Sequence, residues 1–261
     1  MKILYIGNDL ASKTNYNTSM NNLSNHLYIS GIGVFRGSSK SNKVIRLLDM
    51  LWMVFSFRNK VSFVLIDTFS TSNFYYALLT SQLARLLKLK YIPILRGGNL
   101  PKRLVNNKTM CNLIFRYSYK NVAPSNYLKS EFNKHGFSAV LIPNLLEIDN
   151  YKFKSRDVFK PNLLWVRAFD CIYNPTLAIK VFRLLKNHYP NAMLTMVGPK
   201  KDNSFDDVVK LIKTLKLNES IKITGVLKKE EWHKLAEDSD IFINTTNIDN
   251  TPVSVMESMA L

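Results

Sequence analysis

The sequence contains few cysteines, few acidic residues and no long apolar run, and each shortage excludes a class of protein. Cys111 and Cys171 are the only cysteines among 261 residues. They have neither CxxC spacing nor neighbouring histidines, which suits neither a disulfide framework nor a zinc site. No apolar run reaches the roughly 18 to 20 residues of a membrane-spanning helix, and Asp9 interrupts the N-terminus before a secretory signal could finish. We therefore expect a cytoplasmic protein.

Familiar catalytic and cofactor-binding patterns are also missing. There is no G-x-S-x-G elbow and no GxxxxGK[ST] loop. The four histidines have no metal-ligand spacing: His26, His135, His188 and His233. We therefore expect neither a bound metal nor a cofactor.

Positive charge is the unusual bulk property of the chain. Lys and Arg number 36 against 19 Asp and Glu, which gives a formal net charge of +17. Such a charge favours an anionic partner, whether nucleic acid, an acidic membrane surface or a phosphorylated small molecule. The basic residues are scattered along the chain, and we find neither aromatic residues placed to stack on bases nor a known nucleic-acid-binding motif. We therefore do not expect a nucleic acid as the partner. Peripheral binding to an anionic membrane fits better, because each basic residue near such a surface contributes about 1 kcal/mol to the binding.

The apolar pattern predicts an α/β fold. Apolar runs of four to eight residues alternate with longer amphipathic stretches, as in βαβ units. Strands are predicted at 2–7, 61–68, 91–96, 121–124 and 139–143, and then at 162–167, 193–198, 221–225 and 241–245. Helices are predicted at 19–29, 41–57, 73–89, 110–119 and 126–135, and then at 175–187, 205–215 and 229–238.

A polar, charged stretch from Asn144 to Pro161 divides the pattern as an inter-domain linker would. We expect two Rossmann-like parallel-sheet domains, 1–150 and 151–261, that face one another across a cleft. Ligands of open parallel sheets bind beyond the carboxyl ends of the strands, so we expect the ligand-binding residues there.

Two loops of the first half could bind an anion. The loop IGNDLASKTNYNTSMNNL, which includes Asn15 and Asn17, leads into a helix with unpaired N-terminal amides, although an ordinary turn explains it as well. The third strand ends in LRGGNLPKRL, where paired glycines allow close approach and basic side chains surround them. A basic surface turn is the alternative there. The candidates in this second loop are Arg96, Gly97, Gly98, Lys102 and Arg103.

The second half offers a further set of basic and glycine residues. Arg167 follows the first strand, and its guanidinium could donate to phosphate oxygens, or pair with a carboxylate of the fold. Gly198 ends the next strand, and Lys200 and Lys201 after it could bind phosphate or face water.

The last segment, DNTPVSVMESMAL, reads as the start of a helix. Thr251 is predicted as the N-cap and Pro252 as the first helical residue. The amides that follow would carry partial positive charge, and two acids could hold hydroxyl groups of one ligand. Glu257 as a solvated helix residue is the alternative. The candidates here are Asp249, Asn250, Thr251, Pro252, Val253 and Glu257.

Together these stretches resemble the retaining glycosyltransferases of family four, which have the GT-B fold. The similarity runs through KILYIGNDL, LRGGNLPKRL, NVAPSNYLKSEF, LIPN, LLWVRAF, LTMVGPKKD, TGVLKKEEW and DIFINTTNIDNTPVSVMESMAL. The last stretch is the most specific, because such enzymes carry two acidic residues eight positions apart. The resemblance implies that Glu257 binds the nucleotide ribose, Asp249 the donor sugar and Arg167 the leaving diphosphate.

The chain departs from the family at several points. The family's lysine shortly after the arginine has no counterpart, since Ile172 or Tyr173 falls there, and Lys200 or Lys201 would substitute. The sequence KTNYN replaces the glycine-rich first loop. Such enzymes usually continue with another strand and helix, so we expect a C-terminally shortened chain ending at Leu261.

The resemblance implies a hexosyltransferase that acts with retention and without a metal. It would move sugar from a nucleotide-diphosphate donor to a lipid-linked or surface-polysaccharide glycan, such as lipopolysaccharide, at the cytoplasmic face of the inner membrane. Two alternatives stay open: a GT-B nucleotide-sugar epimerase, and a non-catalytic protein that binds nucleotide sugars or anionic lipid.

Overall fold

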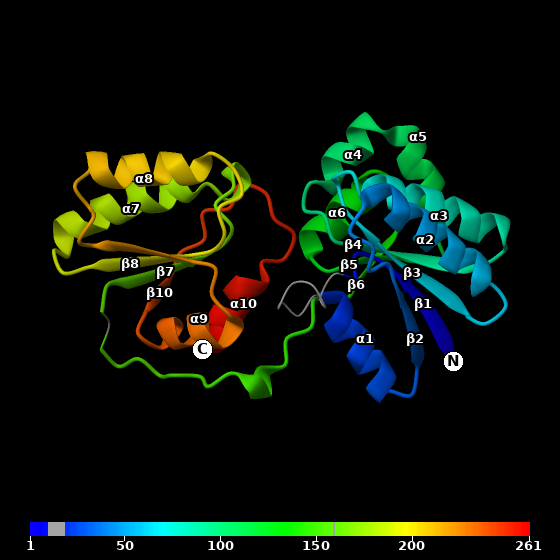
Figure 1. Cartoon of the computed structure of the whole chain (residues 1–261), viewed down its shortest axis with the longest axis horizontal. Coiled ribbons are helices and arrows are strands. Elements are labelled where there is room, and N and C mark those ends of the chain that lie inside the picture. Colours follow the sequence, from blue (N-terminus) through cyan, green and yellow to red (C-terminus); the bar gives the residue numbers. More distant parts are fainter. Residues whose placement is uncertain (10–18, 159) are drawn as a thin grey trace. The chain divides into compact units, whose positions relative to one another are not determined.

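The computed structural model describes residues 1–9, 19–158 and 160–261. The chain forms two compact units. Unit 1 comprises Met1–Leu145 and Asp249–Thr251, and unit 2 comprises Leu146–Ile248 and Pro252–Leu261. Each unit is built around its own parallel sheet (Figure 1).

Unit 1 contains a six-stranded sheet in the order β2-β1-β3-β4-β5-β6, with every neighbouring pair parallel. Its strands are β1 (Lys2–Ile6), β2 (Gly33–Gly37), β3 (Phe63–Thr68), β4 (Lys90–Leu95), β5 (Asn121–Ala123) and β6 (Ala139–Leu141). Its helices are α1 (Ser19–Ile29), α2 (Lys43–Ser56), α3 (Phe74–Leu86), α4 (Leu100–Asn106), α5 (Lys108–Cys111), the π-helical turn η2 (Asn112–Arg116) and α6 (Asn126–Lys134).

Helices cover both faces of the unit 1 sheet, so its central strands are apolar on both sides. Along β1, Leu4 packs in a cluster with Met50 and Val54 of α2, whereas Tyr5 belongs to a second cluster with Met20 of α1. This alternation follows from the two-residue period of a strand. It explains why KILYI reads as an unbroken apolar run.

Unit 2 contains a four-stranded parallel sheet in the order β10-β7-β8-β9. Its strands are β7 (Asn162–Val166), β8 (Met193–Val197), β9 (Ile221–Gly225) and β10 (Ile241–Phe242). Its helices are α7 (Pro175–His188), α8 (Ser204–Thr214), α9 (Lys229–Glu237) and α10 (Val253–Ala260), with short 3-10 turns η3 (Ile148–Asn150) and η4 (Cys171–Tyr173).

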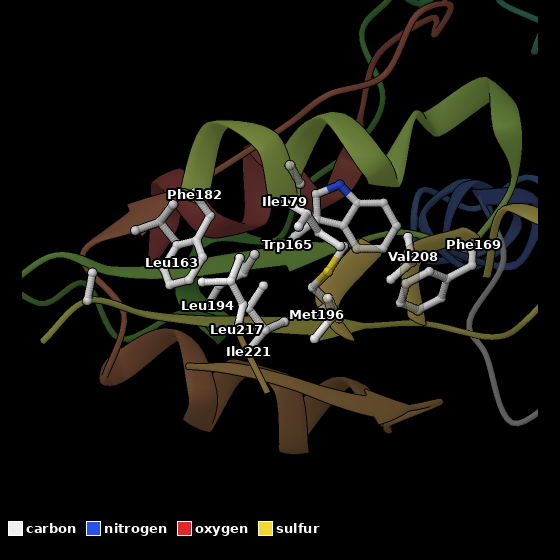
Figure 2. Packing of buried hydrophobic residues seen from close by; sticks show 13 residues of the cluster. Leu163, Trp165, Phe169, Ile179, Phe182, Leu194, Met196, Val208, Leu217 and Ile221 are labelled. Atoms are coloured by element: carbon white, nitrogen blue, oxygen red, sulfur yellow. The ribbon is translucent and has the colours of Figure 1, made fainter. Parts of the chain in front are cut away.

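Two apolar layers enclose the unit 2 sheet. Trp165 and Leu163 of β7 pack with Phe182 of α7 on one face (Figure 2). Leu164, between them in sequence, packs with Trp232 of α9 on the other face. Figure 1 shows α7 and α8 on one side of this sheet and α9 and α10 on the other. The prediction of an α/β fold with parallel sheets is therefore confirmed.

Several predicted elements differ from the observed ones. Strand β2 was not predicted, because GVFRG is short and has glycine at both ends. The predicted helix 110–119 is instead α5 and the π-helical turn η2, and α4 precedes them without having been predicted. Only Ile241–Phe242 of the predicted strand 241–245 pair as a strand. Within the described residues, no helix is both long and apolar enough to cross a bilayer.

Candidate functional site

The carboxyl ends of β7 and β8 bring Arg167 and Gly198 together in unit 2. The Arg167 backbone N–H donates to the Val197 carbonyl at 3.0 Å. Gly198 has a φ of +151°, and a Cβ placed on it would lie 1.8 Å from the Arg167 carbonyl oxygen. The Arg167 guanidinium carbon lies 5.3 Å from the centroid of the Tyr173 ring. Glycine is thus required for the approach that places the arginine at the end of the sheet.

We expect Gly198→Ala to destabilise unit 2 by about 3 kcal/mol or more. The alanine would have to adopt a backbone conformation that favours glycine, and its Cβ would also overlap with the Arg167 carbonyl oxygen. Gly225→Ala is the matched control. Gly225 also has a positive φ, +74°, but a Cβ there would meet no atom within 4 Å. Its cost should stay near 1–2 kcal/mol, that of the left-handed conformation alone. Urea unfolding gives the free energy of unfolding of the two variants. Equal losses would contradict an additional cost from the overlap at Gly198.

Lys200 and Lys201 each have a carboxylate partner. Lys200 Nζ lies 2.8 Å from Asp206 Oδ1, and Lys201 Nζ lies 2.6 Å from Asp170 Oδ2. The hydrogen bond from Asp170 raises the pKa of Lys201, although partial burial acts in the opposite direction. Both lysine side chains are more than half exposed, and exposed pairs contribute only about 0–1 kcal/mol. A phosphate could therefore replace either carboxylate at small cost.

Glu257 is the buried carboxylate of a partly exposed polar cluster in unit 2. Its Oε1 accepts hydrogen bonds from Lys229 Nζ at 2.7 Å and from the Tyr151 hydroxyl at 2.9 Å. Lys229 Nζ also donates to the Tyr151 hydroxyl at 2.7 Å. With 9% of its surface exposed, Glu257 is not a solvated helix residue. Among the described residues both contacts fall on Oε1, which leaves Oε2 to accept hydroxyl groups.

The surroundings of Glu257 keep its partners in defined protonation states. Burial alone would lower the pKa of Lys229, but hydrogen bonds to Glu257 and Tyr151 outweigh it and raise that pKa. Burial raises the pKa of Tyr151, so the hydroxyl stays a donor. His233, whose ring centroid lies 5.2 Å from that of Tyr151, has a pKa lowered by burial, which favours the neutral imidazole. A single ammonium–carboxylate pair therefore sets the charge of the cluster.

The sequence patterns did not point to Tyr151 or Lys229. Tyr151 follows the short turn η3 within the predicted linker. A linker has no helix or strand periodicity that could single out one tyrosine as functional. Lys229 begins α9, four residues after Gly225, the last residue of β9. Its place just after a parallel strand, in TGVLKKEEW, was the available signal.

The segment Asp249–Thr251 packs within unit 1. Asn250 Nδ2 donates to the Leu95 carbonyl at 3.0 Å, and its Oδ1 accepts from the Ser125 hydroxyl at 2.8 Å. A Cβ on Gly98 would lie 2.5 Å from the Asp249 carbonyl carbon. Gly98 thus allows this segment to lie directly against the end of β4.

The prediction that Thr251 caps the last helix and that Pro252 is its first residue is wrong. Helix α10 begins at Val253, Pro252 holds the cap position with extended backbone, and no side chain caps it. The Thr251 hydroxyl donates instead to the Pro124 carbonyl at 3.0 Å. Its acceptor lies 127 residues away in sequence, so local capping preference cannot reveal the contact.

The basic residues around Gly97 and Gly98 are largely engaged inside unit 1. Arg96 is bound to Asp67, Tyr5 and Asn144, as the buried contacts of its guanidinium show. Arg103 donates to the Ser70 carbonyl at 2.9 Å and stacks over Phe74. Lys102 is exposed. Asn15 and Asn17 lie outside the described residues.

Two further features lie at the carboxyl ends of strands. In unit 1 a small hollow at the ends of β1 and β3 is lined by Asn8, Asp67, Asn73 and Tyr76, among others. In unit 2 the ligand atoms of Asp170, Cys171 and Asp202 lie within 4.8 Å of one another.

The unit 2 group already has partners for its carboxylates. Asp170 pairs with Lys201, and Asp202 accepts backbone N–H groups of Cys171 and Ser204 at 2.8 and 2.9 Å. Hydrogen bonds from Ser204 and the Cys171 amide lower the pKa of Asp202 to about 2. The carboxylates therefore act as acceptors for the protein's own donors in this loop.

The comparisons with known proteins agree with this architecture. Residues 148–261 match the model of the family Glycosyl transferases group 1. No curated protein matches the sequence. Among solved structures, Anabaena Alr3699/HepE in complex with UDP-glucose superposes with a TM-score of 0.71 at 15% identity, over 100% of this chain and 78% of that one.

Two other structures show the same fold. The sucrose-phosphate synthase of Thermosynechococcus elongatus gives a TM-score of 0.75 at 11% identity, over 99% of this chain and 78% of that one. The lipopolysaccharide outer core galactosyltransferase WaaB gives a TM-score of 0.64 at 13% identity, over 100% of this chain and 78% of that one. Residues 148–261 therefore match the group 1 glycosyl transferases, and the chain has the GT-B fold.

Proposed function

We propose that this protein transfers a hexose from a nucleotide-diphosphate sugar to a glycan acceptor with retention of anomeric configuration. The observation that carries the proposal is the match of residues 148–261 to the group 1 glycosyl transferases, because that segment contains Arg167, Gly198 and Glu257. The complexes of Alr3699/HepE with UDP and UDP-glucose support a nucleotide sugar as the donor.

In the proposal the unit 2 residues hold the donor's nucleotide. Glu257 Oε2 accepts the ribose hydroxyls while Lys229 and Tyr151 occupy Oε1. Arg167 donates to the diphosphate, and Lys200 or Lys201 adds positive charge after exchanging its carboxylate partner. Asp249 is the proposed contact of the donor sugar.

The proposed reaction forms one bond and breaks one bond at the anomeric carbon. The acceptor hydroxyl oxygen attacks from the face that the diphosphate leaves, and its proton passes to the departing phosphate oxygen. Arg167 stabilises the negative charge that accumulates on that oxygen. Neither a protein nucleophile nor a metal takes part in this scheme, so chelators should leave the rate unchanged.

We further propose a lipid-linked or surface-polysaccharide acceptor at an anionic membrane face. The formal net charge of +17 supports this, and the WaaB neighbour acts on lipopolysaccharide outer core. The acceptor-side candidates Arg96, Gly97, Gly98, Lys102 and Arg103 belong to unit 1.

A transfer assay tests the function. Purified protein is incubated with radiolabelled UDP-, GDP- or TDP-sugars and a polyprenyl-diphosphate-linked monosaccharide, with and without EDTA. We expect label in the lipid fraction, and a loss of about 100-fold or more in Arg167→Ala, since one preorganised donor at developing charge is worth that much. Arg183→Ala, an exposed arginine of α7, is the matched control.

The other outcomes identify the alternatives. Epimerised sugar formed without acceptor would indicate an epimerase, and binding without turnover would indicate a non-catalytic protein. An inverted anomeric configuration in the product, read by NMR coupling constants, would contradict retention.

A further inference from the structure

Helix α2 of unit 1 exposes an apolar face where a water-facing helix would be polar. Met50 and Val54 of this helix are buried in the core. The residues that point to solvent are large and apolar: Val44, Ile45, Leu48, Trp52 and Phe55. We call these five residues the α2 face. At about 100° per residue they fall within an arc of about 100°, opposite the buried positions.

The exposure of the α2 face is large. Leu48 is 60% exposed and Trp52 65%. Single exposed apolar residues are ordinary, but a contiguous stripe marks an interaction surface. The face is about three helical turns long, or roughly 16 Å.

Positive charge frames the α2 face at both ends. Between residues 40 and 60 the only acidic residue is Asp49, and its carboxylate accepts the Ser38 hydroxyl. Arg46 of the same helix is buried, with its guanidinium donating to backbone carbonyls. The remaining cations precede the helix, begin it or follow it: Lys40, Lys43, Arg58 and Lys60. The Arg58 guanidinium lies over the Phe55 ring at 4.1 Å.

We propose that the α2 face docks on an anionic lipid surface. A bilayer interface offers acyl chains to the apolar side chains and anionic headgroups to the flanking cations, the combination that interfacial helices use. Trp52 suits this boundary, because its ring is apolar and its N–H stays near the headgroups.

The framing charges distinguish lipid from a second copy of the chain. An isologous contact places a patch against itself. Two α2 faces would therefore bring the cations Lys40, Lys43, Arg58 and Lys60 of one copy against the same cations of the other. An anionic headgroup layer attracts the same groups. The inference stands independently of sugar transfer, because no donor-site residue contributes to the α2 face.

Tryptophan fluorescence provides a direct test on the full chain. Of the three tryptophans, Trp165 and Trp232 are buried and Trp52 is exposed. We expect vesicles of phosphatidylglycerol and phosphatidylcholine in equal parts to shift the emission to the blue, and phosphatidylcholine vesicles to have little effect. Trp52→Phe should still sediment with the anionic vesicles but lose the shift. Sedimentation without any shift in the natural chain would overturn the proposal.

Sedimentation of variants locates the surface. Leu48→Gln should weaken binding to the anionic vesicles about tenfold, given the apolar area withdrawn from water. Leu184→Gln in α7, at 66% exposure, is the matched control and should leave binding unchanged. Lys43→Gln and Lys60→Gln should each weaken it about fivefold, and added salt should weaken the natural chain.

Three outcomes would overturn the proposal. Equal losses in Leu48→Gln and Leu184→Gln would indicate general apolar adhesion. Equal binding to both vesicle types would remove the role of the cations. A dimer in solution without lipid that Leu48→Gln dissociates would assign the α2 face to a second copy.

Discussion

Arg96→Met should destabilise unit 1 by about 3–5 kcal/mol, because it leaves a buried carboxylate without its counter-charge. Arg96 Nε donates to Asp67 Oδ1 at 3.0 Å, and the exposed fractions of the two side chains are 12% and 7%. The other two guanidinium nitrogens donate to Asn144 Oδ1 at 2.8 Å and to the Tyr5 hydroxyl at 3.0 Å. A methionine fills the space but replaces none of these donors.

The Tyr5 hydroxyl cannot replace the lost guanidinium. Burial first, and the charge of Asp67 second, raise the pKa of Tyr5, so the hydroxyl remains protonated and donates to Asp67 Oδ1 at 2.8 Å. This one hydrogen bond to the Asp67 carboxylate would remain in the variant. Because a hydrogen bond to a charged group contributes about 1.5–3 kcal/mol, it offsets only part of the cost of burying a carboxylate without a counter-charge.

Urea unfolding of three variants separates the charge effect from a packing effect. Arg36→Met removes an arginine that faces Asp9 at 3.6 Å in a more exposed pair of the same unit, and should cost less than about 1 kcal/mol. The double variant Arg96→Met/Asp67→Asn should recover part of the stability, since no charge is then buried alone. A double variant less stable than Arg96→Met would show that packing dominates.

The sheet strands were the most predictable part of the fold. KILYI, FVLIDT and NLLWV are buried on both faces, so each stands out as an apolar run. Strand β2 lies at the edge of its sheet, is buried only at Gly37, and gives no such run. Burial on two faces, and not strand propensity, made the difference.

Contacts between distant residues were the least predictable part. Arg96 reads as a basic residue beside two glycines, yet Asp67 and Tyr5 on neighbouring strands bind its guanidinium. Glu257 was singled out by its spacing from Asp249, but its partner Lys229 lies on another helix. A single sequence gives the position of each residue along the chain, whereas the pairing depends on which strand ends the sheet order brings together.

Glu257→Gln should weaken UDP binding about 10- to 100-fold, because hydrogen bonds to a charged group contribute about 1.5–3 kcal/mol. The amide keeps the size of the side chain but loses the charge that pairs with Lys229 at 2.7 Å. Its nitrogen also replaces one acceptor oxygen by a donor. Glu230→Gln, an exposed glutamate in the first turn of α9, is the matched control and should leave binding unchanged.

A modified ligand decides whether the loss comes from the ribose. 2′,3′-dideoxy-UDP lacks the hydroxyls that Glu257 Oε2 is proposed to accept, so its affinity for the natural chain and for Glu257→Gln should be nearly equal. Calorimetric titration of both ligands into both proteins forms a complete cycle. If the substitution weakened the two ligands equally, Glu257 would act through the packing of unit 2 and not through the ribose. Lys229→Met should also weaken UDP binding, but by less than Glu257→Gln. The Lys229 ammonium holds Oε1 in place and so directs Oε2 at the ligand, and the variant loses this contact.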